Sequence, residues 1–402
     1  MKRFFPSSPI DIILMLSVMV FPCCVCGDSD GSANTKVTGP TYAVTYDMNG
    51  GSAGSVPVDA NRYEQGQTVT VLGNTGNISK EDYVFAGWST AADGSGMGYG
   101  PGQTFAINTD TVLYAKWSYM WEALGSGMDN WVIALAPDAS GTLYAGGDFT
   151  SAGGVTVNRV AKWDGSAWSA LGSGMNDGVY ALALDASGNL YAGGCFTSAG
   201  GVTANSIARW DGSAWSALGS GMNDNVIALA VDSNGALYAG GYFTTAGGVT
   251  ANRVAKWDGS AWSALGSGMN DNVNALAVDS ADRLYAGGAF TQAGGTAANF
   301  IAAWDGAAWS ALGSGIDDNA VNSIAVDGAG NLYAGGYFTL VGGETANYIA
   351  RWDGSAWSTL GDGVDDVVQA LCPAASGDLF AGGGFTQAGS ISADYIVRMR
   401  IQ

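Results

Sequence analysis

Residues 215–261 read WSALGSGMNDNVIALAVDSNGALYAGGYFTTAGGVTANRVAKWDGSA, and this text recurs along the second part of the chain. It contains four short apolar runs separated by turns rich in Gly, Asn and Asp, and none of them has a helical period. A tryptophan opens each copy, at a spacing of 47 or 48 residues: Trp121, Trp168, Trp215, Trp262, Trp309 and Trp357. Four strands in every such period are the signature of a propeller blade. The sequence therefore predicts an all-β propeller of six four-stranded blades over residues 119–402.

One repeat also predicts the order of the strands in a blade. The innermost, second, third and outermost strands are expected at residues 226–231, 237–243, 253–257 and 262–269. The repeats begin with an outermost strand and end with a third strand. Residues 120–127 are therefore expected to complete the sixth blade beside residues 395–400, which would close the ring and remove both exposed sheet edges.

Each repeat also has a Gly-Gly pair and an aromatic pair. Gly240 and Gly241 end the second strand of one repeat, and Trp210 and Trp215 are an aromatic pair in another. Glycine lets neighbouring backbone or rings approach where a Cβ would clash. The pattern resembles the Kelch motif of galactose-oxidase-like propellers, with Trp where Kelch usually has Tyr. It is similar to the Gly-rich Kelch-like repeats of bacterial surface proteins and fungal cortical polarity markers, which implies association with the wall or envelope rather than catalysis.

The N-terminus is expected to be an export signal. Two basic residues precede an apolar run at residues 10–21, which is too short to span ~30 Å of hydrocarbon as a helix. Cys23 and Cys24 follow that run, and the arrangement resembles a bacterial lipoprotein signal, which implies lipidation of one of them. An ordinary secretory signal is the alternative. Residues 1–27 are assigned to the signal and residues 28–40 to a flexible linker.

Residues 41–118 have a different character from the repeats. Apolar residues alternate with polar ones in YVFAGW at residues 83–88 and in TVLYAKW at residues 111–117, and an Asn-Gly-Gly turn follows an earlier run. This pattern predicts a compact β-rich domain, with Trp88 and Trp117 in its core rather than on an exposed aromatic platform. The segment resembles an internalin-type B-repeat, a β-grasp module of bacterial surface proteins, which implies a stalk or an adhesive spacer.

Composition excludes several functions. The 402 residues contain no histidine, so the usual general base of Ser and Cys hydrolases is missing, as are the imidazole ligands of most zinc and copper sites. The copper oxidases that share the Kelch fold need such ligands. The net charge of −20 disfavours nucleic acid and anionic lipid as partners. We expect a monomer that contacts protein or carbohydrate at the cell surface, with the membrane reached only through a lipid anchor.

An acidic turn precedes each innermost strand. Oxygen ligands gathered around one end of a channel could hold Ca²⁺ or attract a cationic ligand, and Ca²⁺ is the only cofactor we consider. Asn and Asp are equally ordinary turn residues. The candidate metal ligands are Asp129, Asp177, Asp224, Asp271, Asp318 and Asp366.

Specificity is expected where the repeats differ. One variable position follows the Gly-Gly pair and another lies inside the innermost strand. The binding candidates are Asp148, Tyr242 and Tyr337 at the first position, and Tyr180, Asn274 and Asn322 at the second. Aromatic rings beside carboxylates suit a sugar or a peptide. Drift among recent duplicates explains the variation equally well.

Three functions fit these features. The preferred hypothesis is an exported envelope or surface protein that acts as a non-catalytic binding or adhesion scaffold for protein or glycan. The second is a structural display unit without a ligand. The third is a carboxylate-dependent glycosidase or lyase acting on polysaccharide. Such an enzyme needs two carboxylates in unlike environments, whereas the repeated turns offer similar ones.

Overall fold

The computed structural model describes residues 39–81, 83–119, 123–374, 377–393 and 395–400. The chain divides into two compact units between residues 121 and 122. All regular secondary structure in the described residues is β-strand. No helix able to span a membrane occurs among these residues. The expected export signal lies outside the described residues, together with its cysteines Cys23 and Cys24.

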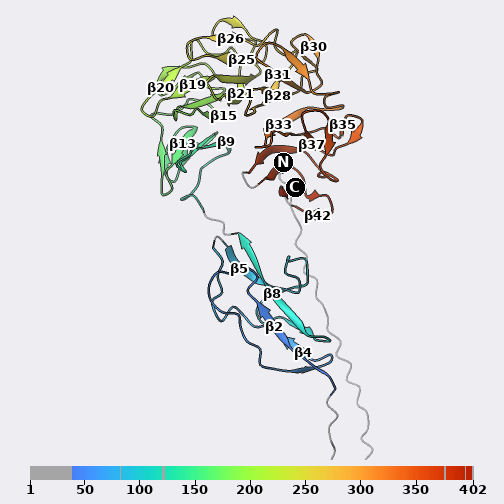
Figure 1. Cartoon of the computed structure of the whole chain (residues 1–402). Helices are drawn as coiled ribbons and strands as arrows, with labels where there is room; N and C mark the ends of the chain where they lie inside the picture. Colours follow the sequence, from blue (N-terminus) through green and yellow to red (C-terminus); the bar gives the residue numbers. More distant parts are fainter. Residues whose placement is uncertain (1–38, 82, 120–122, 375–376, 394, 401–402) are drawn as a thin grey trace, which may run out of the picture. The chain divides into compact units, whose positions relative to one another are not determined.

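The N-terminal unit is built on a four-stranded sheet in the order β2-β8-β5-β6 (Figure 1). Strand β2 runs parallel to β8, which is antiparallel to β5. Two-stranded pairs β1-β3 and β4-β7 complete the unit. The strands are β1 Thr41–Tyr42, β2 Val44–Asp47, β3 Tyr63–Glu64, β4 Thr68–Thr70, β5 Tyr83–Ser89, β6 Gly98–Tyr99, β7 Thr104–Ala106 and β8 Thr111–Tyr119.

Trp88 forms the centre of this unit. Its side chain is fully buried, and its indole Nε1 donates a hydrogen bond to the Leu72 carbonyl at 2.8 Å. The rings of Tyr46 and Phe85 pack edge-on against it, with centroids 4.7 and 4.9 Å away. Trp117 is half-buried and donates to backbone carbonyls of the turn after β2. The core position expected for Trp88 is therefore confirmed.

Within the described residues, the C-terminal unit has six main sheets of three or four strands and six two-stranded hairpins. The strands of each main sheet follow one another in the sequence, with one hairpin inserted between the second and the third. Sheets 1 to 3 consist of β9 Val132–Pro137, β10 Leu143–Gly147, β13 Val160–Trp163 and β14 Trp168–Ala170; β15 Val179–Leu184, β16 Leu190–Gly194, β19 Ile207–Trp210 and β20 Trp215–Ala217; and β21 Val226–Val231, β22 Leu237–Gly241, β25 Val254–Trp257 and β26 Trp262–Ala264. All neighbouring strands within these sheets are antiparallel.

Sheets 4 and 5 repeat this plan, and sheet 6 has three strands within the described residues. They consist of β27 Val273–Val278, β28 Leu284–Gly288, β31 Ile301–Trp304 and β32 Trp309–Ala311; β33 Val321–Val326, β34 Leu332–Gly336, β37 Ile349–Trp352 and β38 Trp357–Thr359; and β39 Val368–Pro373, β40 Asp378–Gly383 and β43 Ile396–Arg400. Figure 1 shows the sheets following one another around a common centre in the order of the sequence.

Each sheet carries a short hairpin that the predicted pattern of four strands did not include. The hairpin lies between the second and third strands of the sheet and consists of two paired strands of two residues each. The hairpins are β11 Ser151–Ala152 with β12 Val155–Thr156, β17 Ser198–Ala199 with β18 Val202–Thr203, β23 Thr245–Ala246 with β24 Val249–Thr250, β29 Gln292–Ala293 with β30 Thr296–Ala297, β35 Leu340–Val341 with β36 Glu344–Thr345, and β41 Gln387–Ala388 with β42 Ile391–Ser392.

Three of the expected strand boundaries were wrong. Strand β22 ends at Gly241, where the backbone of the next residue turns away to bond outside the ladder. Strand β25 begins at Val254 because Arg253 has a φ of 67°. Strand β26 ends at Ala264, since Gly266 has a φ of 59° and turns the chain toward the next sheet. The innermost strand at residues 226–231 is confirmed.

In sheets 2 to 5, the outer-strand tryptophan ties the sheet to the one before it. Trp262 is buried, its indole Nε1 donates to the Leu218 carbonyl at 2.9 Å, and its ring lies 5.4 Å from that of Trp257. Leu218 directly follows the outermost strand of the preceding sheet. The same bond joins Trp168 to Leu124, Trp215 to Leu171, Trp309 to Leu265 and Trp357 to Leu312.

The Gly-Gly pair receives a valine from the next sheet. A Cβ placed on Gly240 would lie 2.6 Å from Cγ1 of Val273, so any larger residue would collide with that side chain. Val273 begins β27 and is fully buried. Equivalent contacts join Gly146 to Val179, Gly193 to Val226, Gly287 to Val321 and Gly335 to Val368. The second glycine meets backbone, since a Cβ on Gly241 would lie 2.2 Å from the Asn225 carbonyl oxygen. The expected approach of neighbouring backbone is therefore confirmed, whereas the valine was not predicted.

The core is divided into clusters that lie between consecutive sheets. One cluster combines Tyr191 and Ile207 of sheet 2 with Val226, Phe243 and Trp262 of sheet 3. The phenylalanine that follows each variable position is fully buried in all six repeats: Phe149, Phe196, Phe243, Phe290, Phe338 and Phe385. Each repeat therefore completes its core only with a neighbour.

The expected closing strand lies partly outside the described residues. Residues 120–122 are not described, and in the described part of the chain no fourth strand pairs with β43. Residues 123–127 are described, and the Leu124 carbonyl accepts the indole of Trp168 in sheet 1. The closure of the ring therefore stays a prediction.

Replacing Trp262 tests the tryptophan contact. We expect Trp262→Phe to lower the free energy of unfolding by about 1 kcal/mol, because a single hydrogen bond is lost. Trp262→Ala should lower it by about 3–5 kcal/mol, because a buried ring is also lost. Denaturant unfolding of the full chain measures both. Trp131→Ala, at a tryptophan that is 76% exposed, is the control and should have little effect; a similar loss there would contradict the assignment.

Candidate functional site

The variable residue after each Gly-Gly pair is held at one end of its sheet. The Tyr242 N–H donates to the Asn225 carbonyl at 3.0 Å, directly before the innermost strand, and Tyr337 bonds in the same way to Ala320. The variable residue therefore lies beside the turn that enters the innermost strand. We call this the variable end; it comprises Asp148, Cys195, Tyr242, Ala289, Tyr337 and Gly384 with the turns before the innermost strands.

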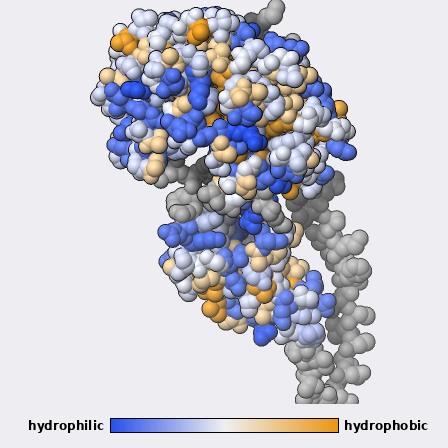
Figure 2. All heavy atoms as spheres, turned by 45° about the horizontal axis from the view of Figure 1, so that its top comes forward, coloured by the Kyte–Doolittle hydropathy of each residue, from blue (hydrophilic) through white to orange (hydrophobic). Residues whose placement is uncertain are grey.

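Two tyrosine rings are available at the variable end. Tyr242 is 37% exposed and Tyr337 is 48% exposed. Tyr238 and Tyr333, in the strands just before them, are buried. On the face shown in Figure 2, hydrophilic and hydrophobic residues are intermixed. Tyr242 and Tyr337 are thus ring faces that a ligand can reach.

Sheets 1 and 2 bring three variable residues together. The Tyr180 hydroxyl donates to Sγ of Cys195 at 3.1 Å, and both Tyr180 and Asp148 lie against Gly178. The hydrogen bond to Cys195 raises the pKa of Tyr180, and burial and the charges of Asp148 and Asp177 add to it. Asp148 and Tyr180 were predicted from the sequence, but the contact of Tyr180 with Cys195 was not. The available signal was that Cys195 stands at the same variable position as Asp148.

Two candidate binding residues join neighbouring sheets. Asn274 donates from Nδ2 to the Val321 carbonyl at 3.1 Å, and Asn322 donates to Oε1 of Gln369 at 3.1 Å. Both bonds connect one innermost strand to the next. The Nδ2 group of each side chain therefore already bonds within the protein. This favours a role in holding neighbouring innermost strands together.

The acidic candidates occupy two different positions in the repeat. Asp129 accepts from the Thr150 and Ser151 N–H groups at 2.8 and 2.9 Å and from the Thr150 hydroxyl at 2.6 Å. Asp318 holds Thr339 in the same way. Asn176 accepts the two equivalent backbone bonds in its own repeat. This first position therefore ties the turn to the hairpin of the same sheet.

The other four acidic candidates stand one residue later in their repeats. Each accepts a hydrogen bond from the next backbone N–H, at 2.7 or 2.8 Å: Asp177, Asp224, Asp271 and Asp366. Across the described residues, no group of three or more acidic or cysteine side chains is placed to hold a metal ion. The Ca²⁺ site stays a prediction, and the observed bonds favour a role in turns.

Hydrogen bonds keep several carboxylates strongly acidic. The Thr150 hydroxyl, with the backbone N–H of Ser151, lowers the pKa of Asp129 to about 2. In the turns between third and outermost strands, the Ala261 N–H and the Ser260 hydroxyl lower the pKa of Asp258 to about 2. These bonds hold the Asp-Gly turn between the third and outermost strands. Both groups stay charged at neutral pH.

Both units resemble known families. Residues 42–116 match the Listeria-Bacteroides repeat domain (List_Bact_rpt), and residues 213–371 match the Rax2 C-terminal beta propeller domain. The chain thus contains a Listeria-Bacteroides repeat domain and an all-β domain of propeller type.

Two proteins with similar sequences are much longer than this chain. A protein of Evansella cellulosilytica named "Putative Gly-rich membrane protein" is 32% identical over 143 residues, which cover 32% of this chain and 16% of that protein. A second, from the same organism and named "Putative membrane protein", is 37% identical over 79 residues. The chain spans 16% and 11% of the lengths of these two curated relatives.

Solved propeller structures share only low identity with the chain. U3-55K has a TM-score of 0.45 and 14% identity, with coverage of 64% of this chain and 75% of that one. Virginiamycin B lyase of Staphylococcus aureus has a TM-score of 0.41 and 10% identity, with coverage of 69% and 87%.

The acidity of Asp129 can be measured by NMR titration. Its carboxyl should ionise at a pKa of about 2, and Thr150→Val should raise that pKa because the hydroxyl is its largest cause. A depressed pKa stabilises the fold above the unfolded value of about 4, and this contribution is lost as the pH falls toward 2. The variant should therefore lose less stability between pH 5 and pH 2. Asp258 is the internal control, and its pKa should not change.

The repeats themselves supply a test of the turn role. Asp129→Asn should leave the melting temperature nearly unchanged, because Asn176 makes the equivalent backbone bonds. Asp129→Ala should lower it, since two backbone donors lose their acceptor. Thermal unfolding with and without millimolar Ca²⁺ measures both. A rise in melting temperature with Ca²⁺ that Asp129→Asn abolishes would instead support the cation site.

Proposed function

We propose that the chain is an exported, non-catalytic binding scaffold of the cell envelope, which contacts protein or glycan through the variable end. The observation that carries this proposal is the contrast between the residues that join the sheets and the residues at the variable end. The residues that join the sheets repeat almost unchanged, whereas the position after Gly-Gly differs in every neighbouring pair of repeats. Two of its members, Tyr242 and Tyr337, expose their rings. Exposed aromatic rings beside polar groups suit sugar or peptide.

The envelope location has separate support. The basic and apolar N-terminus has the features of an export signal. The Listeria-Bacteroides repeat domain precedes the repeats, and both Evansella relatives carry "membrane protein" in their names. Within this proposal, the N-terminal unit is an internalin-type B-repeat that acts as a spacer, the propeller repeats are Kelch-like, and Cys23 or Cys24 carries a lipid.

The proposal also gives the C-terminal unit six blades closed into a ring by residues 120–127. Within the described residues, five sheets have the four strands of a blade, and the sixth has the first three. A closed ring would hold the variable residues of all six repeats at one end of a rigid frame. Positions fixed in this way lose little entropy when a ligand binds.

The carboxylates favour binding over catalysis. A glycosidase needs one carboxylic acid that stays protonated near neutral pH, and so a raised pKa. Within the described residues, each aspartate whose pKa is shifted has it lowered, as at Asp129, Asp258 and Asp327. With no histidine in the chain, we propose that the protein is not an enzyme.

Binding to the variable end can be tested with the full chain on an array of cell-wall glycans and envelope proteins. A Tyr242→Ala/Tyr337→Ala variant should bind its best ligand about ten-fold more weakly, because each stacked ring is worth about 0.5–1.5 kcal/mol. Tyr42→Ala, in the N-terminal unit, is the matched control and should bind normally. Binding that survives the double variant would place the ligand elsewhere, and release of sugar products would favour the polysaccharide-acting enzyme.

A further inference from the structure

One position of the repeat holds a side chain where the backbone favours glycine. The residue directly before each third strand has a φ between 62° and 72°: Arg159, Ser206, Arg253, Phe300, Tyr348 and Tyr395. Only glycine adopts this left-handed conformation without strain, and other left-handed positions of the repeat, such as Gly247 and Gly266, are glycine. Strain that is kept in this way is typical of ligand-binding positions.

This left-handed position lies at the variable end. In sheet 3, the Arg253 carbonyl accepts at 3.0 Å from the N–H of Gly241, which directly precedes the variable residue Tyr242. The Arg253 guanidinium also donates from Nη1 to the Tyr242 carbonyl, and Arg159 bonds in the same way to the Asp148 carbonyl. The two arginines are therefore held beside the variable residues of sheets 3 and 1.

Neither guanidinium has a carboxylate partner among the described residues. The ion pair found there joins Lys256 to Asp232, with Nζ and Oδ2 3.6 Å apart. Carboxylates are not scarce, because the chain has 35 acidic residues and 15 basic ones. A guanidinium has several N–H donors in a planar fork that matches carboxylate and phosphate. Arg159 and Arg253 are half-buried and each bonds one carbonyl, so their charge suits an oxyanion from outside the chain.

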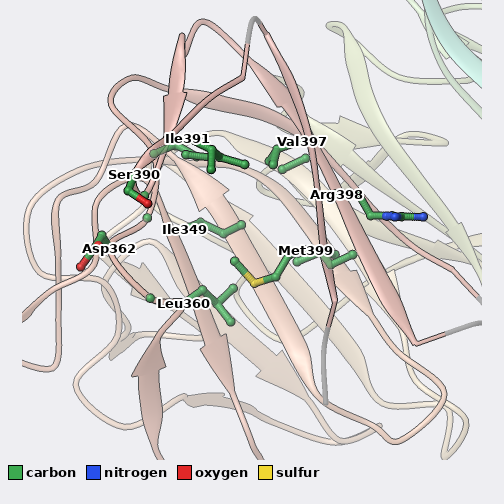
Figure 3. Close-up of a pocket in the computed structure, with 15 residues that line it drawn as sticks. Ile349, Leu360, Asp362, Ser390, Ile391, Val397, Arg398 and Met399 are labelled. Atoms are coloured by element: carbon green, nitrogen blue, oxygen red, sulfur yellow. The ribbon is translucent and has the colours of Figure 1, made fainter. Parts of the chain in front are cut away.

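Two hollows of the C-terminal unit differ in their chemistry. One of about 360 Å³ lies beside β43, and Figure 3 shows the apolar side chains of Ile349, Leu360 and Met399 directed into it. The other, of about 380 Å³, lies between sheets 1 and 2 and is bordered by Arg159. Its remaining walls are mostly polar side chains and glycine. The second hollow therefore suits a polar ligand better than the first.

Hydrogen bonds fix the walls of this second hollow. The Met175 N–H donates to the Asn158 carbonyl at 2.9 Å, and Nδ2 of Asn158 donates to the Ser173 carbonyl at 2.9 Å. These two bonds join sheet 1 to the turn of the next repeat. On the other side, Oδ1 of Asn176 accepts from the Ser198 N–H at 2.9 Å. Walls held in this way lose little entropy when a ligand binds.

We infer that Arg159 and Arg253 are anion-binding subsites of the variable end, and that its ligand is an anionic saccharide, a sugar that carries a carboxylate or a phosphate. In sheet 3, the exposed Tyr242 ring can stack on the sugar while Arg253 binds the oxyanion. In sheet 1, Arg159 offers the same charge at the edge of the polar hollow. The net charge of −20 acts mainly against long polyanions, since salt screens charges more than about 10 Å apart. The inference rests on the proposed function, whose ligand it makes more specific.

Simple anions test the subsites directly. The full chain is titrated at constant ionic strength with glucuronate, inorganic phosphate and glucose, and the arginine Nε–Hε signals are followed by NMR. We expect at least one anion to shift the Arg159 and Arg253 signals saturably, at concentrations about ten-fold or more below those of glucose, because charge-assisted hydrogen bonds are the stronger ones. Arg62, exposed in the N-terminal unit, is the internal control. No saturable shift with either anion, or an equal shift at Arg62, would overturn the inference.

The two anions also distinguish the source of the charge. Tighter binding of glucuronate than of phosphate would indicate a sugar carboxylate, and the reverse would indicate a sugar phosphate. Tyr242→Ala should weaken glucuronate several-fold at Arg253 and leave phosphate unchanged, because only the sugar stacks on the ring.

Variants separate this inference from the proposed function. Arg159→Gln/Arg253→Gln removes both charges and should weaken the best ligand from the array about ten-fold or more, whereas Arg62→Gln should not. If Tyr242→Ala/Tyr337→Ala weakens that ligand and the arginine variant does not, this inference fails and the proposed function stands. If both arginines bind the anions while the tyrosine variant binds the array ligand normally, the proposed function fails and the anion subsites stand.

Thermal unfolding shows whether Arg159 serves the fold instead. Arg159→Gly should leave the melting temperature unchanged or raise it by about 1–2 °C, because glycine adopts this left-handed conformation without strain. A fall of several degrees would mean that the bond to the Asp148 carbonyl holds the sheet together. That result would make the guanidinium a structural group and overturn its role as a subsite.

Discussion

The C-terminal unit depends on the hydrogen bond from each outer-strand tryptophan to a leucine carbonyl of the repeat before it. The bond itself is worth only about 1 kcal/mol. It fixes the position of a large buried ring, however, and that ring closes the core between two sheets. Trp262 and Leu218 show how one residue pair joins a strand end of one sheet to the outer edge of the next. The valine that enters a Gly-Gly pair makes the second connection, nearer the innermost strands. Stability is therefore shared between neighbours, as in other repeat proteins.

Much of this frame could be predicted from the sequence, because its causes are local. The spacing of the tryptophans predicted the repeat, the Gly-Gly pairs predicted a close approach, and the segments rich in Gly, Asn and Asp predicted turns. The two-residue hairpins such as Thr245–Ala246 with Val249–Thr250 were missed, since they are too short to show a period of two. The acidic turns were treated as one set, although Asp129 and Asp177 occupy different positions in the repeat. The two positions differ in their hydrogen-bond partners. The partner of Asp129 lies 21 residues away in the sequence, whereas that of Asp177 is the next residue.

The candidate site was predictable in outline and not in detail. Variation between repeats pointed to the residue after Gly-Gly, and the structure places all these residues at one end of their sheets. The contact of Tyr180 with Cys195 depends on which side chains face each other across two strands, which periodicity does not reveal. The same holds for Asn274 and Asn322, whose amides join neighbouring sheets. Because the residues that join the sheets are repeated, the residues at the variable end can differ between repeats without loss of stability. Such a division of roles suits a scaffold whose ligand is set by a few exposed side chains.

The most direct measurement is hydrogen exchange by mass spectrometry on the full chain, comparing the six segments that begin with an outer-strand tryptophan. If every repeat, including the sixth, is closed by the same contact, residues 121–124 should exchange as slowly as residues 168–171 and 262–265. Complete exchange of residues 121–124 within seconds, while the other five segments stay protected, would contradict a sixth tryptophan contact. Fast exchange in all six would contradict the role of the tryptophan in joining the sheets.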